Sequence, residues 1–138
     1  ALPCPCSRTV EKGMAHQSRL AGFIIDCEGI PADEGARFWA AALGLQAQPA
    51  RAEDAAEYAD LLGAPAGLDV EVQRVDHPSR VHLDIESDDI DAEADRLEKL
   101  GARRIGFVKR WWVMEAPTGH RFCIVRMRER EVPANHWP

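Results

Sequence analysis

Apolar and polar residues alternate along several short stretches of the chain, which is the pattern of strands that bury one face. The clearest examples are residues 68–73 and 81–86, where Leu, Val or Ile occupies every second position. Apolar runs with a weaker alternation predict further strands. They cover residues 20–27, 58–62, 103–108, 111–115 and 121–127.

Two other stretches repeat their apolar residues at helical spacing. The first covers residues 31–43, and it opens with a proline and is followed by a glycine. The second covers residues 90–100, which two aspartates precede and a glycine follows. Proline in the first turn, aspartate before it and glycine after the last turn are ordinary helix boundaries, so both stretches are predicted helices.

The order of one strand, one helix and several strands occurs twice. Residues 23–28 match residues 81–86 in pattern at an offset of 58 positions, and Leu43 matches Leu100 at an offset of 57. Two copies are too few for a solenoid, which needs more repeats to cover its faces. We therefore predict an α+β fold of two tandem βαβββ modules, at about residues 20–76 and 80–127.

The chain has 138 residues, enough for one domain with a real core. We expect residues 1–17 to be a disordered extension and residues 18–138 to be the domain, with residues 128–138 as its tail. The sequence leaves open whether translation starts at Met14. No apolar run approaches the length of a membrane helix, so a membrane span is excluded.

The net charge of −6 disfavours nucleic-acid partners, because such a surface repels phosphate backbones. Cys4 and Cys6 have no second pair with which to complete a metal site, and Cys27 and Cys123 sit in apolar runs. Nothing in this cysteine usage demands an oxidising compartment, so the expected location is the cytoplasm.

Three segments carry a resemblance to a known family: GFIIDCEGIPADEGARFWAAALGL, RVHLDIESDDIDAEADRLEKLGA and WWVMEAPTGHRFCIV. They resemble the glyoxalase-like branch of the vicinal oxygen chelate superfamily, which includes the bleomycin-resistance proteins, over about residues 20–127. The resemblance implies paired modules that form a curved mixed sheet around a central cleft, and a homodimer. Members include isomerases, lyases, dioxygenases and metal-free antibiotic-binding proteins, so the fold alone does not fix the reaction.

Many members hold a divalent metal with ligands from the first and last strands of each module. The resemblance places these positions on Gly22, near Gln73, on His82 and on Cys123. His82 is the one strong candidate, since glycine has no side chain and an amide is a poor anchor. We therefore expect no cofactor, and a divalent metal remains the alternative.

Strand alternation gives an independent view of the site. Val81, Leu83 and Ile85 should face a helix, which leaves His82 and its alternate neighbours on the opposite, polar face. We predict His82 and Glu71 as a catalytic pair, with an imidazole as general base beside a carboxylate. The predicted ligand-binding residues are Gln73, Asp84, Trp112, Arg121 and Cys123. The alternative is that these polar residues are simply solvated, as on any open sheet.

Three functions remain open from the sequence. The first is a metal-independent protein that sequesters a small organic ligand in a polar cleft. The second is a metal-dependent lyase, isomerase or dioxygenase that acts on vicinal oxygens, and the third is a non-catalytic interaction module. The partner that we expect is a small molecule, with no nucleic acid and no membrane.

Overall fold

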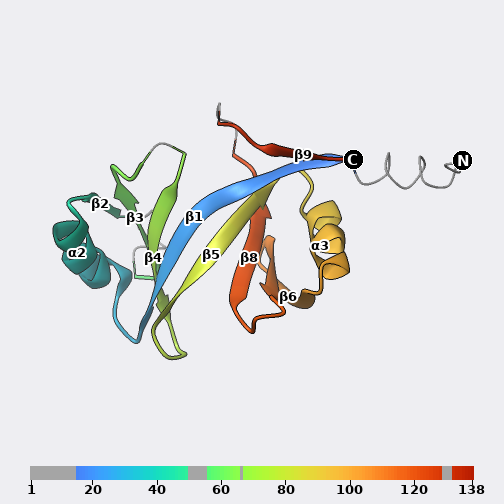
Figure 1. Ribbon diagram of the computed structural model, residues 1–138. Helices are drawn as coiled ribbons and strands as arrows, with labels where there is room; N and C mark the ends of the chain where they lie inside the picture. The colour runs from blue at the N-terminus through green and yellow to red at the C-terminus, as the bar shows by residue number, and fades with distance from the viewer. Residues whose placement is uncertain (1–14, 50–55, 66, 129–131) are drawn as a thin grey trace, which may run out of the picture. The chain divides into compact units, whose positions relative to one another are not determined.

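The computed structural model describes residues 15–49, 56–65, 67–128 and 132–138. These residues divide into two compact units: those within 21–83 form one, and residues 15–20 together with those within 84–138 form the other. Each unit carries one helix and several strands (Figure 1). The predicted α+β fold of two βαβββ modules is confirmed.

Two strands run from one unit into the other along the chain. They are β1 (His16–Glu28) and β5 (Arg80–Ser87). β1 begins at His16, so the prediction that the disordered extension reaches residue 17 is wrong at its last two positions. His16 and Ser18 of this strand are buried. Residues 1–14 of the predicted extension lie outside the described residues.

The unit of residues 21–83 is the first module. Its strands follow the order β2-β3-β4-β1, with antiparallel pairs except for the parallel pair of β1 and β4. α2 lies against β2, β3 and β4 (Figure 1). The new elements are α2 (Ala32–Leu43), β2 (Gln46–Pro49), β3 (Tyr58–Leu62) and β4 (Asp69–Val75).

Small residues let α2 approach its sheet closely. Ala32, Ala36 and Ala40 recur every four residues and are buried against Val72 and its neighbours in the core. The helix ends at Gly44, which has a left-handed backbone with φ of 70° that glycine adopts without strain. The predicted helix boundaries therefore hold for a physical reason.

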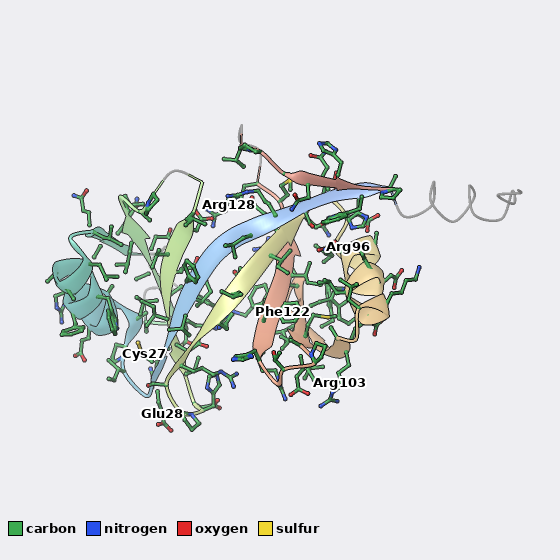
Figure 2. All side chains as sticks on the ribbon, viewed as in Figure 1. Cys27, Glu28, Arg96, Arg103, Phe122 and Arg128 are labelled. Carbon is green, nitrogen blue, oxygen red and sulfur yellow. The ribbon has the colours of Figure 1, made fainter. Side chains whose placement is uncertain are left out.

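The second module contains α3, the part of β5 from Asp84 on, and the strands that follow, in the order β5-β8-β7-β6. Its core joins α3 to β7 and β8 through Ile90, Ala94, Met114, Phe122 and Ile124; Phe122 is marked on β8 in Figure 2. The predicted start of α3 is confirmed, because the Asp89 carboxylate caps the helix by accepting from the Ala92 amide. The elements are α3 (Ile90–Lys99), β6 (Arg103–Val108), β7 (Trp111–Glu115), β8 (Arg121–Arg126) and β9 (Asn135–Trp137).

The short strand β9 was not expected in the polar tail. It pairs with the first residues of β1, and tertiary contacts hold it there. Trp137 Nε1 donates to Ser18 Oγ at 2.8 Å, and the Arg96 guanidinium of α3 lies 3.8 Å from the centroid of the Trp137 ring (Figure 2 marks Arg96). β2 was also missed, because the segment Gln46–Pro49 has no run of strand-forming residues.

One prediction about β5 is wrong. Ile85 packs on the α3 core, as expected, but Val81 and Leu83 are 59% and 44% exposed. The reason is that α2 contacts β2, β3 and β4, and α3 contacts β6, β7 and β8, so neither helix has its main contacts at the start of β5.

Among the described residues, no helix is long and apolar enough to cross a membrane.

Candidate functional site

A row of polar side chains crosses the face of the first module that lies opposite α2. Tyr58 of β3 is paired with Gln73 of β4, and Gln73 is paired with Asp26 of β1. Directly paired residues share a face of a sheet. The row continues to His82 of β5, whose ring contacts Asp26. The structure thus brings the predicted residues Gln73 and His82 to one face.

The same face carries further acidic groups. Glu71 of β4 is paired with Asp60 of β3 and with Ile24 of β1, and Asp69 of β4 is paired with Gly22 of β1. Val70 and Val72 point the other way, into the α2 core. The predicted alternation along β4 is therefore confirmed. The face combines an imidazole, an amide and carboxylates, with buried Ile24 as an apolar neighbour.

Asp26 is the site residue that sequence reasoning missed. Its side chain is 2% exposed, and its Oδ2 atom lies 2.7 Å from His82 Nδ1, while the His82 side chain is 11% exposed. Arg80 Nε lies 3.9 Å from the same oxygen. Asp26 Oδ1 is buried and has no hydrogen-bond partner among the described residues.

A signal for Asp26 was present in the sequence. Ile25 and Cys27 belong to the α2 core, so period-two alternation sends Asp26 to the polar face. The apolar run before Asp26 indicated a strand, and the polar residue within that strand was overlooked. The predicted carboxylate partner of His82 was Glu71, whereas in the structure Asp26 is the carboxylate that contacts the His82 ring.

The resemblance places the family's first-strand metal ligand at residue 22, which is a glycine in this chain. A Cβ atom there would overlap the carbonyl oxygen of Asp69 and would lie 2.7 Å from the Asp69 nitrogen. β1 and β4 can pair this closely because residue 22 has no side chain. A side-chain ligand at residue 22 would displace β4. The close packing of β1 against β4 therefore leaves this metal position without a ligand.

The other three family positions do not supply enough strong metal ligands. They carry an amide at Gln73, an imidazole at His82 and a half-buried thiol at Cys123. Zinc and iron sites usually need at least three strong protein ligands, and Gly22 and Gln73 supply none. The residues at the four family positions therefore do not fit the metal that the family implies.

The predicted residues of the second module lie mainly in ion pairs or on the open face of their own sheet. Arg121 Nε donates to Glu115 Oε2 at 3.3 Å, and Arg103 donates to Glu115 Oε1 at 3.0 and 2.7 Å. Hydrogen bonds from Arg103 first and Arg121 second lower the pKa of Glu115 below its usual value. Cys123 is paired with Val113, and Asp84 of β5 is half-buried.

Trp112 is not placed as predicted. It packs against the α3 core, and its Nε1 donates to Asp91 Oδ1 at 2.8 Å. The Arg104 guanidinium lies 4.6 Å from its ring centroid. Trp112 therefore supports α3. Trp111 is the tryptophan on the opposite face of β7, because neighbouring residues in a strand alternate.

The comparisons with known proteins agree with this architecture. A glyoxalase-like domain model matches residues 22–125, and no curated protein matches the chain. A methylmalonyl-CoA epimerase variant of Streptomyces coelicolor, in complex with 2-nitronate-propionyl-CoA, is 17% identical, with 85% of this chain and 99% of that chain covered and a TM-score of 0.57.

Two further solved structures share the fold. A hypothetical protein from Bacillus halodurans C-125 is 12% identical, with coverage of 84% of this chain and 99% of that one and a TM-score of 0.58. The methylmalonyl-CoA epimerase of Mycobacterium tuberculosis is 14% identical, with coverage of 79% and 89% and a TM-score of 0.54. At these identities the likeness concerns the fold alone. The match of the domain model over most of the chain shows that the protein belongs to the glyoxalase-like family of the vicinal oxygen chelate superfamily.

Proposed function

We propose that this protein binds a small organic molecule without a metal ion and sequesters it, in the manner of the bleomycin-resistance branch of the superfamily. The observation that carries the proposal is the packing of Gly22 on Asp69, which removes one metal ligand, together with the polar row beside it. A polar face that has lost a metal ligand keeps the groups that bind an organic molecule directly.

The polar face of the first module offers what such a ligand needs. Gln73 supplies both a donor and an acceptor, Glu71 supplies a carboxylate, and His82 supplies an imidazole held by Asp26. Ligand sites combine apolar contact with a few placed polar groups, and Ile24, which is paired with Glu71, is an apolar residue of this face. The excess of carboxylates favours neutral or cationic molecules over anions.

Thermal unfolding of the full chain with a panel of neutral and cationic aromatic compounds tests the proposal. Binding raises the stability of the folded state by RT ln(1 + [L]/Kd), about 2.7 kcal/mol at a hundredfold excess over Kd. We expect the same rise in Tm with a chelator and with added zinc, manganese, iron or nickel.

Variants separate the ligand site from the rest of the surface. Gln73→Ala and Glu71→Gln should reduce the rise in Tm, while Asp76→Asn, which removes the same charge from an exposed turn, should not. Loss of binding on chelation would contradict the proposal. Neutral results for every polar substitution would contradict it too, and would favour the interaction module.

A metal-dependent lyase, isomerase or dioxygenase is the second candidate. It is favoured by the contact of Asp26 with His82, because metal-bound histidines commonly donate their other ring N–H to a carboxylate. The methylmalonyl-CoA epimerases among the similar structures point to isomerisation within this candidate. It requires turnover that disappears on chelation and in His82→Ala. Homodimerisation and a cytoplasmic location stay predictions.

A further inference from the structure

We propose that Asp26 is a ligand-binding residue, whose buried Oδ1 atom accepts a hydrogen bond from a primary ammonium group of the ligand, beside the side-chain amide of Gln73. The inference rests on the proposed function, because it names the ligand class for the same face of the first module. That class is a small organic molecule with a primary amine, which carries a proton at neutral pH.

The two carboxylate oxygens of Asp26 have unequal surroundings. Oδ2 lies 2.7 Å from His82 Nδ1. Oδ1 is buried and has no hydrogen-bond partner among the described residues, in a side chain that is 2% exposed. The ring contacts Oδ2 whether the imidazole is neutral or protonated, so in neither state does this contact serve Oδ1. A carboxylate oxygen only accepts, so Oδ1 calls for a donor.

Burial makes the lack of a donor costly. A charged oxygen that leaves water without gaining a hydrogen bond loses its hydration and receives nothing in return. Arg80 does not supply the bond, because its Nε atom lies 3.9 Å from Oδ2, beyond hydrogen-bond distance, and its side chain is 46% exposed. A ligand group that donates to Oδ1 removes this cost, so binding gains from it.

Gln73 lies next to Asp26 and leaves a way to it. The two residues are directly paired between β4 and β1, so their side chains share a face. Gln73 is half-buried, and its side-chain amide makes no hydrogen bond to another described residue. A side chain held by no such bond can turn aside. Its Oε1 atom can then accept from the same ammonium group, which has three N–H donors.

The charges on this face favour a cation over a neutral donor. Asp60, Asp69 and Glu71 lie on the same face of the module, and their summed field attracts positive charge. A quaternary ammonium has the charge without a donor, and an alcohol has a donor without the charge. A primary ammonium has both, so it fits Asp26 and the surrounding field together.

Benzylamine, benzyltrimethylammonium and benzyl alcohol separate the two requirements. They share a benzyl group, and they differ in whether they present a charged donor, a charge alone or a neutral donor. The full chain is titrated with each probe while carbon-13 NMR follows the carboxyl carbon of Asp26, which is assigned by its loss in Asp26→Asn. We expect benzylamine to shift this signal saturably. It should bind about tenfold more tightly than either other probe, the usual scale for one hydrogen bond.

Three variants assign the effect to the named groups. Asp26→Asn should abolish the advantage of benzylamine over benzyltrimethylammonium, and Gln73→Met, which removes the amide at similar size, should reduce it. Asp60→Asn removes the same charge from the same face, so it should weaken both cations alike and keep their ratio. Thermal unfolding checks that each variant folds. Should Asp26→Asn fail to fold, Gln73→Met and the wild-type titration still decide.

Each of four results would overturn the proposal. They are equal binding of the three probes, no binding of benzylamine, a stationary Asp26 signal, and an advantage that persists in a folded Asp26→Asn or in Gln73→Met. A water molecule alone at Oδ1 would give the stationary signal. The titrations run with a chelator present, so a stoichiometric metal found separately would defeat the proposed function and not this ratio. Tight binding without an advantage for benzylamine would defeat this inference alone.

Discussion

The backbone of Asp69 on β4 occupies the space that a side chain on Gly22 of β1 would need. The parallel pairing of β1 with β4 aligns the two residues, and the approach is close enough that a Cβ would overlap the Asp69 carbonyl oxygen. The family's metal position and the packing of this module therefore make incompatible demands on residue 22. In this chain residue 22 is a glycine, which allows the close packing of β4 and provides no metal ligand.

Gly22→His should fail to create a metal site and should destabilise the fold. The imidazole must displace β4. Such an overlap with backbone atoms should lower the free energy of unfolding by about 3 kcal/mol or more. Denaturant unfolding measures the loss. Gly106→Ala is the control, because a Cβ there meets nothing within 4 Å. Wild-type stability with a bound ion in Gly22→His would show that the packing argument is wrong.

Glu93→Gln should destabilise the second module, and the effect should depend on pH. The Glu93 and His16 side chains are 0% and 1% exposed, with Glu93 Oε1 at 2.7 Å from His16 Nε2, and Arg96 donates to both carboxylate oxygens. Burial alone would raise the pKa of Glu93, but hydrogen bonds from Arg96, His16 and Ser18 outweigh it and the pKa is lowered. The expected loss at neutral pH is about 3 kcal/mol, since a buried pair loses one partner.

The sign of the pH effect follows from the lowered pKa. The contribution of the Glu93 charge is fully present above the pKa of an unfolded glutamate, about 4.3, and is lost as pH falls through the lower folded value. The unfolding free energies of wild type and Glu93→Gln should therefore converge in acid. A difference that stays constant from neutral pH to strong acid would contradict this assignment.

Trp137→Ala should loosen the C-terminal strand. The substitution removes the donor to Ser18 and the ring beneath the Arg96 guanidinium, with an expected cost of about 2 kcal/mol. Hydrogen exchange of the amides in β9 and in the first residues of β1 should speed up. His136→Ala, an exposed neighbour in the same strand, is the control. Unchanged exchange in Trp137→Ala would mean that the backbone pairing alone holds β9.

Trp112→Phe should lower stability and leave ligand binding unchanged. The phenyl ring keeps much of the packing but cannot donate to Asp91, which costs about 1 kcal/mol. Trp111→Phe makes the same change on the opposite face of β7. Calorimetric unfolding and probe binding can be measured on both variants. A loss of binding confined to Trp112→Phe would return Trp112 to the ligand site.

The sequence predicted the elements that carry a regular pattern. Both helices begin and end within about one residue of the expected positions, because Pro31, Gly44 and Asp89 fix their ends chemically. β4 and β8 also follow their alternation. β2 and β9 escaped prediction because their pairing partners, and not their own composition, hold them in place.

The candidate site was predicted in part. His82, Glu71 and Gln73 lie on one face, as alternation required. Asp26 was not predicted, because it follows an apolar run in the sequence. Trp112 was misplaced because two adjacent tryptophans give no sign of which one faces the helix. The bond of Trp112 to Asp91 of α3 decides it, and that contact spans 21 positions of the chain.

The metal content of the full chain, purified without a histidine tag or chelator, tests whether the protein works without a metal ion. The sample is incubated with zinc, iron, manganese and nickel, desalted and analysed beside His82→Ala. We expect far less than one ion per chain in both proteins, since Gly22 and Gln73 leave the family's metal positions without enough strong ligands. About one ion per chain in the wild type, lost in His82→Ala, would contradict it and would make the oxygen-chelating enzyme the correct description.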